Sequence, residues 1–165
     1  MHRKISGASS RVLQKGFTVV ELSVVVIILS ILATIVIVAI GDYQVQARDG
    51  QRTADNEVIV RSLERHYRTQ AIAVGASYPA TTAGAAGIAT IVDQPDAVIA
   101  PEQATNSVVI ATTNAAQTPT VSQYIYQPLN LNGSLCTATP CVRFKMYYRL
   151  EQTNTVVTRE SMRQQ

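Results

Sequence analysis

The sequence predicts an α+β protein in which one long N-terminal helix packs on a four-stranded antiparallel β-sheet. Three observations predict it: an apolar segment over residues 17–40, an amphipathic segment directly after it, and a strict two-residue alternation over residues 141–151. The chain has 165 residues, of which 47% are hydrophobic and 15% are charged. These values suit one domain and exclude an intrinsically disordered chain, which needs low hydrophobicity and high charge.

A basic segment precedes the apolar one. Residues 1–16 contain Arg3, Lys4, Arg11 and Lys15 and no acidic residue, which gives this segment a charge of +4. The whole chain has 14 basic and 11 acidic residues, so the remainder holds 10 against 11 and carries −1. The net charge of +3 therefore comes from the first segment and does not indicate a nucleic-acid-binding domain.

The apolar segment runs from Phe17 to Ile40 and contains one charged residue, Glu21. As a helix it is roughly 36 Å long, which is enough to cross a bilayer. A helix is expected because it is the single-segment structure that satisfies its own backbone polar groups in lipid. The basic flank should stay in the cytoplasm, so residues 41–165 are expected outside it. Since no small-residue cleavage site follows the segment, we expect the mature protein to keep it.

Glu21 lies about one turn inside the apolar segment, where an unpaired carboxylate is costly. A cut between Gly16 and Phe17 would create an α-amine four residues before this carboxylate. Ammonium and carboxylate attract each other strongly in a medium of low dielectric constant, although their desolvation offsets much of that gain. Pairing within one chain or between adjacent chains would therefore set the register of packed helices rather than add much stability.

The junction of the basic and apolar segments resembles the N-terminus of the type IV pilin and pseudopilin family. The resemblance rests on the basic leader, on the apolar run, and on the residues Lys15, Gly16, Phe17, Thr18, Glu21 and Leu22. It implies that a prepilin peptidase removes a leader whose basic residues include Arg11 and Lys15, cleaves between Gly16 and Phe17, and methylates the new amine of Phe17. It also implies that Glu21 pairs with the amine of a neighbouring subunit.

The resemblance further implies a structural subunit rather than an enzyme. The precursor would be a single-pass protein of the bacterial inner membrane with its N-terminus in the cytoplasm. After losing the leader, residues 1–16, it would join a helical homo-oligomer through residues 17–40 with the help of an assembly platform in that membrane. The product would be an extracellular pilus used in adhesion, twitching motility or DNA uptake. Two alternatives stay open: a pseudopilin of a type II secretion or competence system, and a single-pass anchored protein whose N-terminus is not cut.

Residues 41–76 are predicted to continue the helix as an amphipathic half. Ile59, Leu63 and Tyr67 recur on one face and form an apolar stripe for a globular partner. The opposite face carries two i,i+4 pairs in the favourable order, Glu57–Arg61 and Glu64–Arg68. Gly75 and Pro79 should end the helix, because glycine favours helix C-termini and proline cannot continue a helix. The RDGQR stretch at residues 48–52 is also similar to many members of the family.

Residues 77–165 are predicted to form the extracytoplasmic globular domain. We expect a surface loop over residues 80–106, with one short helical turn near Pro95–Val98, because this segment is rich in Ala, Thr and Gly. Four strands are expected, at Ser107–Thr113, Ser122–Pro128, Cys141–Glu151 and Thr155–Ser161. Packed antiparallel on the helix stripe, these strands would give the predicted α+β layers, as in the pilin headpiece.

The two cysteines of the chain are Cys136 and Cys141. In an extracytoplasmic domain, a disulfide is the default interpretation of such a pair. It would close a short loop, worth roughly 2 kcal/mol in the chain-entropy model. With no histidine nearby in the sequence, we do not expect a metal site there.

Other functional classes find little support in the residue pattern. His2 and His66 belong to no recognisable nucleophile–base set, and no glycine-rich phosphate loop occurs, so we predict no enzymatic activity and no cofactor. Asp93, Asp96 and Glu102 do not follow a regular calcium-loop spacing. A solvated acidic loop is the favoured interpretation of these three residues, so we predict no metal.

A nucleic-acid partner is a further hypothesis. Arg143, Lys145 and Arg149 alternate along the third predicted strand, with Tyr147 between them. Such a stripe could contact DNA phosphates and stack a base on the tyrosine ring. We favour the simpler interpretation, which is a solvated outer face of the sheet.

Overall fold

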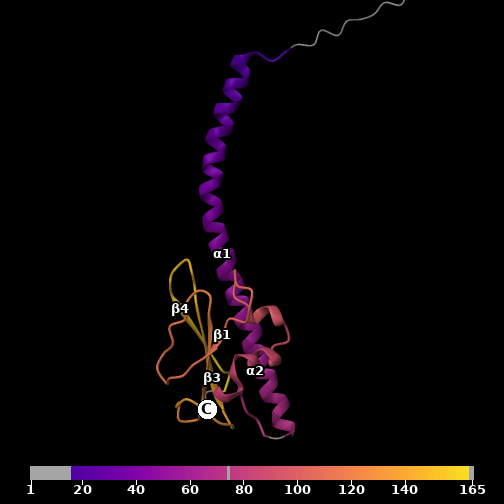
Figure 1. Cartoon of the computed structure of the whole chain (residues 1–165), viewed down its shortest axis with the longest axis vertical. Coiled ribbons are helices and arrows are strands. Elements are labelled where there is room, and N and C mark those ends of the chain that lie inside the picture. The colour runs from indigo at the N-terminus through magenta and orange to yellow at the C-terminus, as the bar shows by residue number, and fades with distance from the viewer. Residues whose placement is uncertain (1–15, 74, 164–165) are drawn as a thin grey trace, which may run out of the picture. The chain divides into compact units, whose positions relative to one another are not determined.

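The computed structural model describes residues 16–163 except residue 74, without the side chains of residues 37–39 and 71–73. The leader residues Arg11 and Lys15 therefore lie outside the described residues. The chain divides into two compact units, residues 1–41 and residues 42–165, which are described separately. We call residues 42–165 the head; β1, β3, β4 and α2 are labelled in Figure 1.

Helix α1 (Val19–Ala73) begins in the first unit and ends in the head. Its end precedes Gly75, whose φ of 100° is a left-handed backbone conformation that favours glycine. Within the head, the predicted apolar stripe of α1 is buried: Ile59 and Leu63 are 0% exposed and Tyr67 is 8% exposed.

The head contains four strands in the spatial order β1-β2-β3-β4: β1 (Val108–Ile110), β2 (Tyr124–Leu129), β3 (Arg143–Arg149) and β4 (Val156–Glu160). The β2–β3 and β3–β4 pairs are antiparallel, whereas β1 is parallel to β2. The prediction of a wholly antiparallel sheet is therefore wrong at β1. Residues 111–123 are long enough to return the chain to the same end of the sheet, which a parallel pair requires. The predicted fold class, a long helix with a four-stranded and mostly antiparallel sheet, is confirmed.

One face of the sheet and the α1 stripe together form the core. Phe144, Met146 and Tyr148 of β3 are each at most 2% exposed. They join Ile59 and Leu63 in one cluster of buried side chains. Each apolar side chain that leaves water in this way contributes about 1.5–3 kcal/mol. The two-residue alternation of β3 thus predicts correctly that these three side chains are buried.

The segment over residues 80–106 is more regular and more buried than the predicted surface loop. It contains the 3₁₀ turn η1 (Thr81–Ala83), helix α2 (Gly84–Ile91) and the 3₁₀ turn η2 (Pro95–Val98). η2 is the predicted helical turn, whereas the loop prediction is wrong at α2 (Figure 1). Ile88 is 0% exposed and belongs to the core. The high helix propensity of alanine and the burial of this apolar side chain outweigh the unfavourable glycines.

The side chain of Glu64 is buried, which corrects its predicted place on the solvated face of α1. It is 4% exposed, and its Oε1 accepts hydrogen bonds from the Tyr78 hydroxyl and the Met162 backbone N–H, both at 2.9 Å. Arg68 donates to the main-chain oxygen of Glu64, so the predicted Glu64–Arg68 ion pair is replaced. Burial and the neighbouring carboxylate raise the pKa of Tyr78 well above its ordinary value.

The Sγ atoms of Cys136 and Cys141 lie 2.07 Å apart, at the distance of a disulfide. The loop between them is hydrogen-bonded to the segment that follows α1. The backbone N–H of Tyr78 donates to the oxygen of Cys141, and the N–H of Thr81 donates to the oxygen of Cys136. The N–H of Cys141 donates in turn to the Ser77 hydroxyl. This loop therefore fixes the path of the chain between α1 and η1.

Candidate functional site

The start of α1 carries the residues predicted to act in processing and assembly. Gly16 and Phe17 precede the helix without regular secondary structure, and the Phe17 side chain is 87% exposed. Glu21 lies in the first turn of α1 and is also exposed. The bond between Gly16 and Phe17 thus lies in the kind of non-helical chain that peptidases cut most readily.

Thr18 and Glu21 cap the N-terminus of α1 reciprocally. The backbone N–H of Glu21 donates to Thr18 Oγ1 at 3.2 Å, and the backbone N–H and hydroxyl of Thr18 both donate to Glu21 Oε2 at 2.9 Å. This arrangement is a capping box, which satisfies N–H groups that the first turn of a helix leaves unpaired. The pairing is not among the predictions made from the sequence, although the spacing T-x-x-E is its signature.

The capping box uses one of the two carboxylate oxygens of Glu21. Both bonds from Thr18 end on Oε2, and within the described residues Oε1 accepts no hydrogen bond. An ionised carboxylate can accept at both oxygens. The first turn of α1 therefore holds the Glu21 carboxylate in one orientation. Its Oε1 can still accept a hydrogen bond from a donor outside the described residues.

Behind Glu21, the helix presents an apolar surface. Its large apolar side chains from Val20 to Val36 are 48–70% exposed. The hydroxyls of Ser23, Ser30 and Thr34 donate back to helix carbonyls at 2.7–2.8 Å, so their polar groups are satisfied within the helix. The most apolar window has a mean hydropathy of 3.2, and by length and composition the helix can cross a membrane. Lipid or other helices must cover such a surface in water.

Alanine at Thr18 should loosen the first turn of α1, because the methyl group cannot replace the hydroxyl in the capping box. Loss of a threonine N-cap costs about 1 kcal/mol. We expect the amide protons of the first turn to exchange about fivefold faster with solvent deuterium in detergent micelles. Thr18→Ser keeps the hydroxyl and should exchange like the unchanged chain. Equal exchange rates in the alanine and serine variants would contradict this role for the hydroxyl.

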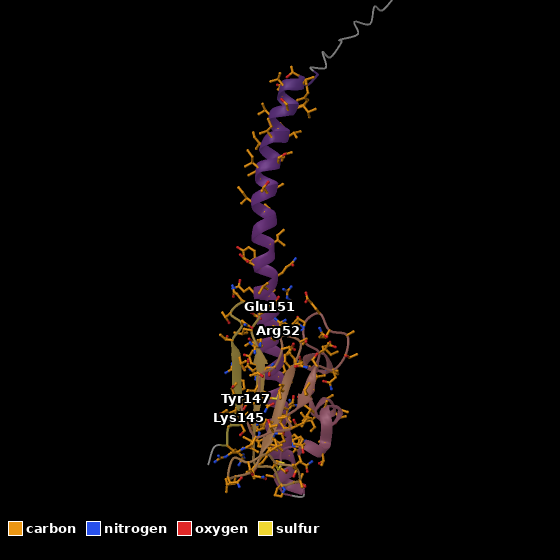
Figure 2. All side chains as sticks on the ribbon, turned by 60° about the vertical axis from the view of Figure 1, so that its left-hand side comes forward. Arg52, Lys145, Tyr147 and Glu151 are labelled. Carbon is orange, nitrogen blue, oxygen red and sulfur yellow. A yellow bond between two sulfur atoms is a disulfide. The ribbon has the colours of Figure 1, made fainter. Side chains whose placement is uncertain are left out.

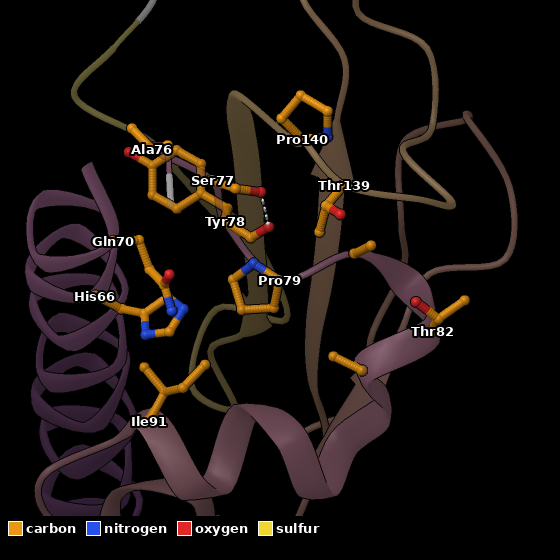
Figure 3. A pocket seen from close by; sticks show the side chains of 13 residues that line it. His66, Gln70, Ala76, Ser77, Tyr78, Pro79, Thr82, Ile91, Thr139 and Pro140 are labelled. Carbon is orange, nitrogen blue, oxygen red and sulfur yellow. Dashed lines mark hydrogen bonds between the residues drawn. The ribbon is translucent and has the colours of Figure 1, made fainter. Parts of the chain in front are cut away.

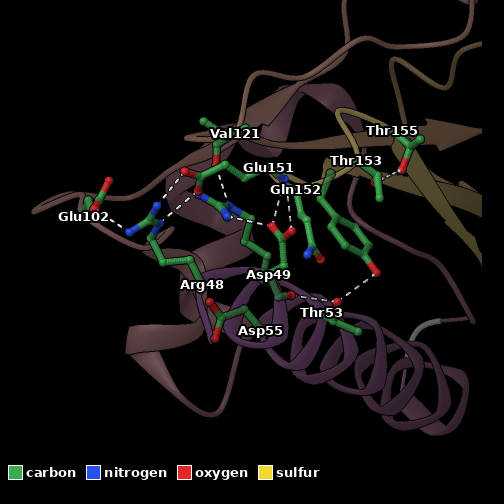
Figure 4. A network of polar contacts seen from close by, with 12 residues as sticks. Arg48, Asp49, Thr53, Asp55, Glu102, Val121, Glu151, Gln152, Thr153 and Thr155 are labelled. Carbon is green, nitrogen blue, oxygen red and sulfur yellow. Dashed lines mark hydrogen bonds and ion pairs between the residues drawn. The ribbon is translucent and has the colours of Figure 1, made fainter. Parts of the chain in front are cut away.

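A second polar cluster lies in the head around Arg52, and its partners Asp49, Val121 and Glu151 are labelled in Figure 4. The Arg52 side chain is 2% exposed. Its guanidinium contacts the carboxylates of Asp49 at 2.9 Å and Glu151 at 3.2 Å, and its Nε donates to the main-chain oxygen of Val121 at 2.8 Å. One buried side chain of α1 thus binds both the loop before β2 and the turn between β3 and β4.

Arg48 and Asp49 extend this cluster. Arg48 bonds Glu151 at 2.6 Å and Glu102 at 3.2 Å. Asp49 accepts the backbone N–H groups of Glu151 at 2.8 Å and Gln152 at 3.0 Å. The hydrogen bond from Arg48 holds the pKa of Glu151 below its ordinary value. Because every charge has a partner of opposite sign and the links are internal, this cluster stabilises the head and offers no reactive group.

Two of the three acidic residues considered for calcium, Asp93 and Glu102, have partners elsewhere in the head. Asp93 pairs with Arg65 and bonds the Ser62 hydroxyl, while Glu102 pairs with Arg48. Among the described residues, no group of three or more His, Cys, Asp and Glu side chains could hold a metal ion.

The stripe considered for DNA is also changed by the fold. Tyr147 is 5% exposed, and its hydroxyl donates to Gln127 at 2.8 Å, so its ring cannot stack a base. Lys145, which is labelled with Tyr147 in Figure 2, pairs at 2.8 Å with Glu160 on the neighbouring strand. Arg149 donates to main-chain oxygens of its own chain. Tyr147, Lys145 and Arg149 therefore make contacts within the head and do not form an open surface on which a nucleic acid could bind.

The match found by comparison with known proteins lies in the first unit. The family model described as the prokaryotic N-terminal methylation motif matches residues 11–40, which include Gly16, Phe17 and Glu21. No curated protein and no solved structure matches the chain. The chain carries the prokaryotic N-terminal methylation motif, which is the hallmark of the precursors of type IV pilins and pseudopilins.

Proposed function

We propose that this chain is the precursor of a structural subunit that polymerises through residues 17–40 into a type IV pilus. The observation that carries the proposal is the methylation motif over residues 11–40, which coincides with the start of an exposed apolar helix. The motif fits a membrane-anchored precursor that is itself the substrate of a peptidase. We accordingly assign the chain a structural role and no catalytic one.

Processing would create a positively charged partner for the Glu21 carboxylate. Hydrolysis of the bond between Gly16 and Phe17 removes the basic leader, with Arg11 and Lys15, and leaves an ammonium group on Phe17. Methylation of that nitrogen keeps its positive charge and its ability to donate hydrogen bonds. Because Oε1 of Glu21 accepts no bond among the described residues, it is available to the ammonium of an adjacent subunit.

Pairing of this kind would set the register between subunits. The pair would lie among apolar side chains, where a carboxylate without its partner would remain as a buried charge. Before assembly, the apolar helix would hold the subunit in the bacterial inner membrane with the N-terminus in the cytoplasm and the head outside. On assembly, the segments 17–40 would exchange lipid for one another, and the heads would form the outer surface of the extracellular filament.

The mature N-terminus tests the proposal. Mass spectrometry of the protein isolated from its native cells should find a chain that begins with N-methylated Phe17. Replacing Gly16 by valine changes the residue before the cut, and that variant should still begin at its leader. A native protein that begins with Met1 would refute the proposed processing, and the chain would then be a plain membrane-anchored protein.

A pseudopilin would share this processing, so electron microscopy has to separate the two assignments. Cells should carry long surface fibres that antibodies to the head decorate and that deletion of the gene removes. If no such fibres exist and deletion instead impairs protein secretion or DNA uptake, the chain is a subunit of a type II secretion or competence pseudopilus.

A further inference from the structure

A groove of about 730 Å³ opens in the head where four segments meet (Figure 3). Its walls come from the last turns of α1, from the chain between Gly75 and Ala83, from Ile91 at the end of α2, and from the disulfide loop at Thr139 and Pro140. The hydrogen bonds between that loop and residues 77–81 hold two of these walls together. The groove lies entirely within residues 42–165, so it does not depend on how the two units are arranged.

Four polar side chains line this groove without a hydrogen-bond partner among the described residues: His66 and Gln70, which are half-buried, and Thr82 and Thr139, which are exposed at its rim. Figure 3 shows His66 and Gln70 together on the α1 side and the two threonines across from them. An amide, an imidazole and two hydroxyls can both donate and accept. The groove therefore offers a set of unused hydrogen-bonding groups from separate segments that converge on one space.

The groove has no charged residue among those that line it. Burial lowers the pKa of His66 below its ordinary value, so the imidazole is neutral at pH 7. A charged ligand would find no counter-charge among the residues that line the groove. An extended peptide cannot pair as a strand with the chain between Gly75 and Ala83, because the N–H groups of Tyr78 and Thr81 already donate to the disulfide loop.

We propose that this groove binds a short neutral saccharide. Each sugar hydroxyl donates and accepts at one atom, which suits amide, imidazole and hydroxyl partners alike. Pro79, Pro140 and Ile91 supply apolar surface for the C–H faces of a sugar ring. The volume falls within the range of about 300–1,000 Å³ that is usual for small-ligand sites. The proposal concerns the head and holds whether or not the chain polymerises.

The test uses the full chain in detergent, screened against an array of neutral oligosaccharides, with the affinity of the best one measured by calorimetry. Gln70→Ala and Thr82→Val each remove one unused hydrogen-bonding group and should weaken binding by about three- to tenfold. Gln103→Ala removes an exposed amide elsewhere in the head and should leave the affinity unchanged. Near-ultraviolet circular dichroism checks that each variant keeps the fold of the head.

Three outcomes would overturn the proposal. The first is that no neutral saccharide binds at millimolar concentration. The second is that the Gln70 and Thr82 variants bind as tightly as the unchanged chain. The third is that acidic saccharides or peptides bind this groove while neutral saccharides do not. Filament yield of the same variants gives an independent readout, since it should stay normal if residues 17–40 drive assembly, whatever the groove binds.

Discussion

Replacing Glu21 by glutamine should abolish filament assembly while the monomer still folds and is still processed. Glutamine, like glutamate, occurs at the N3 position of a capping box, which Glu21 occupies here, so the hydrogen bonds with Thr18 can persist. What disappears is the negative charge that would meet the Phe17 ammonium of the next subunit. Breaking a buried ion pair in this way costs about 3–5 kcal/mol. That loss corresponds to a hundredfold or greater decrease, on the order of magnitude, in the affinity between subunits.

Quantification of sheared filaments by immunoblotting checks this expectation. Glu57→Gln is the matched control, because Glu57 lies on the exposed face of α1 in the head and its loss should leave the filament yield unchanged. Mass spectrometry of the membrane fraction should find the Glu21 variant cut before Phe17. Normal filament yield from Glu21→Gln would show that the charge is dispensable, and loss of filaments in both variants would indicate an effect on expression instead.

Replacing Arg52 by alanine should lower the free energy of unfolding of the head by about 3–5 kcal/mol. The side chain is 2% exposed, and it contacts two carboxylates and the main-chain oxygen of Val121. Its removal leaves Asp49 and Glu151 with less positive charge beside them and leaves the half-buried main-chain oxygen of Val121 without this donor. The resulting loss should therefore exceed that caused by removing an exposed arginine.

Arg61→Ala is the control for this comparison. Arg61 lies on the same helix and forms the predicted pair with Glu57, but its side chain is 67% exposed. An exposed pair is worth about 0–1 kcal/mol, so this variant should unfold almost like the unchanged chain. Urea unfolding of the full chain in detergent, followed by the near-ultraviolet dichroism of tyrosine, measures both. Similar losses in the two variants would contradict a special role for the buried guanidinium.

Several features could be predicted from the sequence because they depend on residues close together along the chain. The apolar run after Glu21 needs no distant partner to be recognised, and neither does the helix that it forms. The buried positions of β3 follow from alternation along a single strand, as Phe144 and Met146 show. The residues at the predicted cleavage junction likewise form a short contiguous motif, which lies within the match to the family model.

Other features depend on partners that the fold brings from far away. β1 runs parallel to β2, a direction that the path of residues 111–123 determines and that no local pattern encodes. Tyr147 alternates like an outward-facing residue, yet it is buried and bonded to Gln127. Glu64 has the spacing of a solvated helix charge, yet the Met162 N–H that binds it is 98 residues away.

The sequence therefore suffices to recognise the methylation motif and the apolar helix of the first unit, since hydrophobicity and charge act there over one or two helical turns. The burial of Glu64 and the contacts of Arg52 emerge when distant segments pack together. The physical reason is desolvation: whether a polar side chain stays in water or is buried depends on whether the folded chain supplies opposite charges and hydrogen-bond partners. Those partners come from separate loops, so the spacing of residues along α1 does not reveal them.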